Sequence, residues 1–168
     1  MNAETLRVLI AFDGSSSAMA VARCWSSWES GRVSLEASLL TITPGHAASA
    51  GNAAACPPLA DKLTTAKAWF SQAGLALESV VVEGEKPAKE IIEEAQHRKV
   101  DLIAMGTRGL SPLRGLLLGS VAAEVASRSP IPIWLMGPNA AIPAALGRVL
   151  RLLVAIDGSK QAAHAANW

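Results

Sequence analysis

The chain has 168 residues, of which 51% are hydrophobic and 17% charged, and its formal net charge is +1. This length and composition are typical of one globular domain with a well-buried core, with or without extra sequence. Without a basic run, a stretch of roughly 18 apolar residues, a signal-like start or a cysteine framework, we expect a cytoplasmic protein with no nucleic-acid or membrane partner.

The first half of the chain alternates strand-like and helix-like segments. Residues 6–12 form a near-continuous apolar run of strand length. Three serines then cap a helix that is predicted to reach about Trp28. Residues 32–43 contain a second strand, 59–73 a helix, and the small, turn-prone residues 44–58 between them a loop. A loop of that length is usually functional or mobile, and its role is left open.

The second half continues the alternation. A third strand is predicted over 75–82, and Pro87 suits the first turn of a helix whose apolar residues fall on one face. A fourth strand covers 102–105. The last strand, 130–135, is flanked or entered by two prolines, which indicates the edge of a sheet.

The βαβ order of these segments predicts an α/β fold. Strands that are apolar throughout favour an open parallel sheet with helices on both faces, in three layers. Ligands of such sheets bind beyond the carboxyl ends of the strands. Asp13 and Gly106 both follow strands directly, so we expect them to meet at that edge.

A glycine-punctuated loop lies between the fourth strand and the next helix. Gly106 and Gly109 are followed, after nine residues, by Gly119 and Ser120. Glycines let backbone N–H groups approach an anion, and the start of a helix adds partial positive charge. Ser120 occupies the position expected for the helix N-cap. The pattern is neither a P-loop nor Gly-x-Gly-x-x-Gly, and it predicts a phosphate site of another kind.

At these residues the chain resembles the universal stress protein family, in its ATP-binding branch, which carries Gly-x2-Gly-x9-Gly followed by Ser or Thr. The resemblance extends over about residues 5–137 and includes three flanking segments, 11–15, 82–88 and 130–135. It implies a domain over residues 1–137 with strand order 3-2-1-4-5.

The resemblance also implies a site for ATP, with Mg²⁺. Asp13 would contact the adenosine end, with a turn-stabilising role as a compatible alternative. Ile42, at the end of the second strand, would face the adenine, and Met105 would lie beside the base or be an ordinary core residue. Arg108 would reach a phosphate or lie in solvent. The residues implied to hold the phosphates are Gly106, Gly109, Gly119 and Ser120, and Val121 is implied to belong to the same binding site.

The chain also contains an internal repeat. Of the nineteen aligned pairs between residues 6–24 and 150–168, nine are identical. We therefore interpret residues 150–168 as the first strand and partial helix of a second unit of a tandem protein, joined by a linker over 138–149.

The function predicted from these features is that of an ATP-binding regulatory or sensor domain in the stress response. No catalytic residue and no cluster of metal ligands is predicted, so the domain would be at most a weak ATPase. We expect a homodimer through the last strand, Ile131 to Leu135, and a signalling partner that the sequence does not identify. Two alternatives stay open: a dimerisation or interaction module without nucleotide, and an enzyme that forms AMP and pyrophosphate, against which the Asp-Gly-Ser-Ser turn argues.

Overall fold

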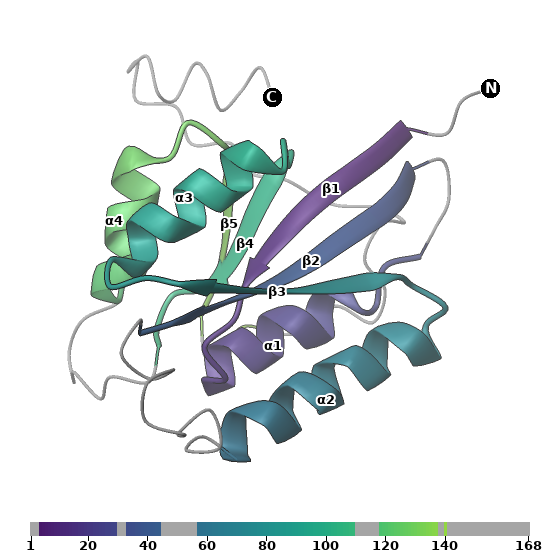
Figure 1. Ribbon diagram of the computed structural model, residues 1–168. Coiled ribbons are helices and arrows are strands. Elements are labelled where there is room, and N and C mark those ends of the chain that lie inside the picture. The colour runs from purple at the N-terminus through teal and green to yellow at the C-terminus, as the bar shows by residue number, and fades with distance from the viewer. Residues whose placement is uncertain (1–3, 30–32, 45–56, 110–117, 138–139, 141–168) are drawn as a thin grey trace.

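The computed structural model contains a five-stranded parallel sheet in the order β3-β2-β1-β4-β5, with helices on both faces (Figure 1). It describes residues 4–29, 33–44, 57–109, 118–137 and 140. The strands are β1 (Glu4–Ala11), β2 (Val33–Thr43), β3 (Leu77–Glu83), β4 (Leu102–Gly106) and β5 (Ile133–Met136). The helices are α1 (Ser16–Trp25), α2 (Pro57–Gln72), α3 (Pro87–His97) and α4 (Ser120–Arg128). The predicted fold class and strand order are confirmed.

Strand β1 lies at the centre of the sheet, between β2 and β4. Val8, Leu9 and Ile10 have no exposed surface. Their alternation places Val8 and Ile10 in the core beneath α1 and α2, and Leu9 in the core beneath α3 and α4. Because both faces are covered there, residues 8–11 of the strand are all apolar, whereas the polar residues Glu4, Thr5 and Arg7 lie at its less buried start. The carboxyl end of β1 is paired with β2 on one side and with β4 on the other.

Helix α1 begins where the serines predict and ends sooner than Trp28. The Ser15 hydroxyl accepts a hydrogen bond from the Ala18 N–H at 3.1 Å, as an N-cap does. At the other end, the backbone N–H and the hydroxyl of Ser27 both donate to the Cys24 carbonyl, at 3.0 and 2.6 Å. These local bonds replace the next helical hydrogen bonds and turn the chain out of the helix.

Cys24 and the tryptophans of α1, α2 and the turn after α1 pack in the core on one face of the sheet. Trp25 stacks on Trp28, with ring centroids 5.8 Å apart, and meets Trp134 of β5 edge-on at 4.9 Å. Trp69 packs from α2 against the same core. Cys24 has no exposed surface, and its burial raises the pKa of the thiol to about 11. The thiol therefore stays neutral near pH 7 and behaves as a small apolar side chain.

Helix α3 is tied to the outer strand β3 by Arg98. The Arg98 guanidinium donates to Glu78 of β3 at 2.7 and 3.2 Å and to Glu94 of α3 at 2.5 Å. The hydrogen bonds that it donates to Glu78 and Glu94 raise the pKa of Arg98 further above its ordinary value. This anchor is at the C-terminal end of α3, and the N-terminal end, at Pro87, lies toward the carboxyl edge of the sheet.

Strand β5 is shorter than predicted, because it begins at Ile133 and not at Pro130. Pro132 has no N–H to donate, and only its carbonyl reaches β4, where it accepts from Ile103 N–H at 3.0 Å. In the described part of the chain β5 is an edge strand, as the prolines predicted. The other predicted boundaries differ from those observed by a few residues at most.

The predicted linker 138–149, apart from Ala140, and the repeated segment 150–168 lie outside the described residues. The same holds for most of the predicted loop 44–58, so its role and the two-unit interpretation stay predictions. None of the helices described above is long and apolar enough to cross a membrane.

Helix α2 docks on the sheet through Phe70 and Ala66, neither of which has exposed surface. We predict that Phe70→Ala lowers the free energy of unfolding by about 3–5 kcal/mol, because it leaves a cavity that the backbone cannot close. Urea denaturation measures this, with the exposed Lys67→Ala as control, expected to change it by less than about 0.5 kcal/mol. Equal stability of the two variants would contradict this packing of α2.

Candidate functional site

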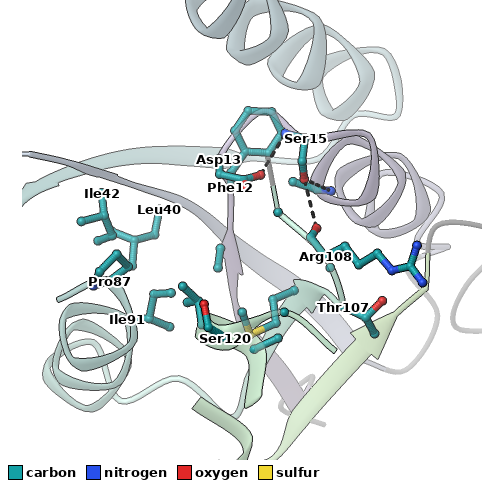
Figure 2. Close-up of a pocket in the computed structure, with 18 residues that line it drawn as sticks. Phe12, Asp13, Ser15, Leu40, Ile42, Pro87, Ile91, Thr107, Arg108 and Ser120 are labelled. Atoms are coloured by element: carbon teal, nitrogen blue, oxygen red, sulfur yellow. Dashed lines mark hydrogen bonds between the residues drawn. The ribbon is translucent and has the colours of Figure 1, made fainter. Parts of the chain in front are cut away.

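A cavity of about 300 Å³ opens at the carboxyl edge of the sheet, where β1, β2 and β4 end (Figure 2). Its volume is at the lower end of the range for small-molecule sites. The first residues of α3 and α4, Pro87 and Ser120, also line it. In an open parallel sheet, ligands bind at this edge where the connections run to opposite sides, here between β1 and β4.

The structure brings all nine residues that the sequence predicted for binding to this one cavity. They are Asp13, Ile42, Met105, Gly106, Arg108, Gly109, Gly119, Ser120 and Val121. They belong to the ends of three strands, to the loop after β4 and to the start of α4. Residues from both halves of the described chain therefore share one surface.

The apolar wall of the cavity was only partly predicted. Leu40, Pro87 and Ile91 join Ile42 on one side of it, opposite Asp13 and Arg108 (Figure 2). Two signals in the sequence could have identified them. Alternation along β2 puts Leu40 and Ile42 on the same face, and a spacing of four puts Pro87 and Ile91 on one side of α3.

The turn after β1 is fixed by Asp13. Its Oδ1 accepts a hydrogen bond from the Ser15 N–H at 2.9 Å, and Gly14 between them has a φ of +75°. The expected turn role of Asp13 is therefore confirmed. Its other oxygen lies against the loop after β4, because a Cβ added at Gly109 would be 2.7 Å from Asp13 Oδ2. A side chain at position 109 would displace the carboxylate.

Gly106 serves packing whether or not a ligand is present. A Cβ at this position would lie 2.5 Å from the Ser17 Cβ and 3.1 Å from the Ser17 carbonyl carbon. Only glycine lets the end of β4 come this close to the first turn of α1. The loop that follows β4 is thereby laid across the N-terminus of α1.

The start of α4 differs from the prediction, since its N-cap is Gly119 and Ser120 is the first helical residue. The Gly119 N–H donates to the Thr107 carbonyl at 2.6 Å, and its own carbonyl accepts the first helical bond, from Ala123 N–H at 2.9 Å. These two bonds hold Gly119 at the N-cap in an extended conformation, with φ −70° and ψ 158°. Ser120 is therefore displaced into the first turn.

Gly119 has no side chain that could accept hydrogen bonds from the free N–H groups in the first turn of α4. Among the described residues, no side-chain hydrogen bond caps this helix. The N–H groups of Ser120, Val121 and Ala122 have no partner within the helix. All three residues line the cavity, so the positive end of the helix dipole lies at its wall.

Strand β2 reaches further along the sheet than β1. The Phe12 N–H donates to the Leu40 carbonyl at 2.8 Å, and the described residues show no bond from Ile42 to the chain that continues beyond Phe12. Backbone groups alternate in direction along a strand, so those of Ile42 point the same way as those of Leu40, past the end of β1. A donor and an acceptor are therefore left at the apolar end of the cavity.

Two charged side chains, Asp13 and Arg108, are found among the described residues that line the cavity. They carry opposite charges. Arg108 is exposed, and its side chain extends away from Leu40 and Ile42 (Figure 2). The polar character of the cavity thus comes mainly from backbone groups.

Comparison with known proteins agrees with this architecture. Residues 4–136 match the sequence profile of the universal stress protein family. The universal stress protein YxiE of Bacillus subtilis is 36% identical over 74 residues, which are 44% of this chain and 49% of YxiE. A universal stress protein solved in complex with cAMP is 28% identical, with a TM-score of 0.61 over 80% of this chain and 98% of that one. The structure of MJ0577 from Methanocaldococcus jannaschii has the same fold, with a TM-score of 0.67 over 78% of this chain and 94% of that one, at 23% identity.

The chain therefore belongs to the universal stress protein family, as its glycine pattern predicted. It spans about half the length of the curated relative YxiE.

The different surroundings of the two glycines predict different effects of the same substitution. Gly106→Ala should lower the free energy of unfolding by about 1–3 kcal/mol, because its Cβ overlaps Ser17. Gly119→Ala should cost much less, since its Cβ meets no atom closer than 3.4 Å. Thermal and urea denaturation of the two variants measure the difference. An equal loss would show that the close approach of β4 to α1 is not a constraint.

Proposed function

We propose that this domain binds an adenine nucleotide, ATP with Mg²⁺, as a regulatory ligand in a cytoplasmic stress response, with slow or no hydrolysis. The observation that carries the proposal is the cavity itself, which joins an apolar wall with free backbone groups to an uncapped helix N-terminus. The 28% identical family member that was solved with cAMP supports an adenine nucleotide in this fold.

The apolar end suits the base. Leu40, Ile42, Pro87 and Ile91 offer aliphatic surface for its faces. Adenine has an amino donor beside ring-nitrogen acceptors, and the free C=O and N–H of Ile42 are the complementary pair. Backbone recognition of this kind does not depend on the side chain at position 42.

The opposite end suits a phosphate. The free N–H groups at the start of α4 and the partial charge of the helix stabilise an anion without a lysine. The Gly119 N–H is not one of these donors, because it is bonded to Thr107. Gly119 instead contributes the absence of a side chain next to the phosphate.

Asp13 fits a role toward the sugar or Mg²⁺. Its carboxylate is exposed at the cavity, and after the bond from Ser15 it keeps several free lone pairs. Ribose hydroxyls could donate to these. Mg²⁺ usually binds one or two carboxylates together with phosphates and waters, and Asp13 can supply one such ligand. The described residues contain no group of three or more acidic, His or Cys side chains that could hold a metal alone.

The same lining supports slow or absent hydrolysis. Asp13 and Arg108 are the ionisable side chains on the described wall, and Asp13 is already held by Ser15 and lies against Gly109. Hydrolysis of ATP requires a group that orients water in line with the γ-phosphate and a cation on the leaving oxygen. The described wall supplies the Asp13 carboxylate and backbone N–H groups. These groups bind and orient a nucleotide without activating water.

The edge strand β5 supports a second proposal, that the domain forms a homodimer. If the domain binds no nucleotide, dimerisation would itself be its function. Ile133, Trp134 and Leu135 are each only half-buried. The carbonyls of Pro132 and Met136 accept hydrogen bonds from β4 and from the loop after it. The backbone groups of Trp134, which lies between them at the same alternation, therefore also point toward β4. By alternation, the backbone groups of Ile133 and Leu135 face away from the sheet and are open to another strand.

We predict that the purified domain binds ATP in isothermal titration calorimetry and that Gly119→Val weakens binding at least about tenfold. The branched side chain would stand between the loop after β4 and the first turn of α4, where the phosphate would lie. The fold should survive, because valine at an N-cap costs only about 1 kcal/mol. Ala126→Val, at an exposed position of α4, is the matched control. Unchanged ATP affinity in Gly119→Val would refute the site.

We also predict a dimer, with a mass by light scattering of twice 17.4 kDa. Leu135→Pro should shift it to monomer, because it removes an outward N–H while leaving the bonds to β4. A monomeric wild-type domain at high concentration, or a Leu135→Pro variant that dimerises as well as the wild type, would exclude pairing through β5. If a monomeric domain still binds nucleotide, the binding proposal holds independently of the dimer proposal.

A further inference from the structure

The Ser15 hydroxyl has two partners. It accepts from the Ala18 N–H at 3.1 Å as the N-cap of α1, and it donates to the Arg108 carbonyl at 3.4 Å. A serine hydroxyl has one donor and two acceptor positions, so it can make both bonds at once. Ser15 is 5% exposed. The second bond links the turn after β1 with the loop after β4.

That bond fixes the direction of one peptide group. In a planar trans peptide, the C=O and the next N–H point in opposite directions, and the described residues contain no cis peptide bond. Because the Arg108 carbonyl is directed to Ser15, the Gly109 N–H is directed away from it. The described residues offer no acceptor for this N–H.

The Gly109 N–H lies beside the start of α4. A Cβ added at Gly119 would be 3.8 Å from the Gly109 nitrogen. The donor therefore lies next to the uncapped first turn, whose N–H groups line the same cavity. Without the bond from Ser15, glycine at 109 would let this peptide rotate, because glycine tolerates both signs of φ.

We propose that Ser15 is a positioning residue for the phosphate: its hydroxyl holds the Arg108–Gly109 peptide so that the Gly109 N–H and the first turn of α4 point at one anion. The proposal rests on the proposed function and adds a residue of the cavity wall that acts through the Arg108–Gly109 peptide. It separates the role of Ser15 from that of Asp13, whose bond goes to the Ser15 backbone and is kept when the side chain changes.

The test is a calorimetric comparison of ATP with adenosine. Ser15→Ala should weaken ATP about fivefold to tenfold, the effect of one hydrogen bond. Adenosine affinity should change by less than about twofold, because the base end of the cavity is untouched. Ser15→Thr, which keeps the hydroxyl, should restore ATP binding.

Two further variants separate positioning from helix capping. Ser26→Ala removes a buried hydroxyl from the other end of α1, where it donates to the Arg23 carbonyl, and should leave both affinities unchanged. Ser15→Gly keeps most of the capping stability, since glycine is itself a favourable N-cap residue. It should show the same loss for ATP alone.

Three results would overturn the proposal: unchanged ATP affinity in Ser15→Ala and Ser15→Gly, an equal loss for adenosine, or no recovery with Ser15→Thr. If the wild-type domain binds neither ligand, the proposed function itself fails, which is a different outcome from selective loss in the variants.

Discussion

Much of this site depends on the close contact between the end of β4 and the first turn of α1. Gly106 lets the backbone approach Ser17 to a distance that no side chain would permit. The loop after β4 is thereby laid over the turn after β1, where the Ser15 hydroxyl donates to the Arg108 carbonyl and the Asp13 carboxylate lies against Gly109. The same loop, through Thr107, receives the N–H of Gly119 and so fixes where α4 begins. A packing constraint in the core thus sets the geometry of the cavity.

The cavity that results stabilises charge with backbone dipoles more than with ionised side chains. The charges of Asp13 and Arg108 cancel, and Arg108 lies in solvent. Helix N–H groups are fixed by the fold and need no rearrangement when an anion arrives. Such fixed donors are suited to holding an anion in one orientation, and the ionisable side chains on the described wall are Asp13 and Arg108. This balance is why binding, more than turnover, is proposed.

The sequence predicted the fold and half of the residues that line the cavity, because those features depend on patterns along the chain. Apolar runs separated by helices predicted the parallel sheet. The glycine spacing, through the family resemblance that it carries, predicted the strand order and nine residues that line the cavity. The errors fall where a tertiary contact decides a local structure. The bond from Gly119 to Thr107 moved the N-cap away from Ser120, and the bonds of Ser27 ended α1 early. The Ser15 bond to Arg108 joins residues 93 positions apart and has no signature in the sequence.

The central claim is that one nucleotide binds with its base at Ile42 and its phosphate between Gly109 and α4. The most direct measurement is an NMR titration of the ¹⁵N-labelled domain with ATP, followed through its backbone amides. The account predicts the largest shifts at Ile42, Gly109, Ser120 and Val121, and small shifts along the outer face of α2. Shifts confined to α2 and β3, or no shifts at ATP concentrations that occur in cells, would contradict it.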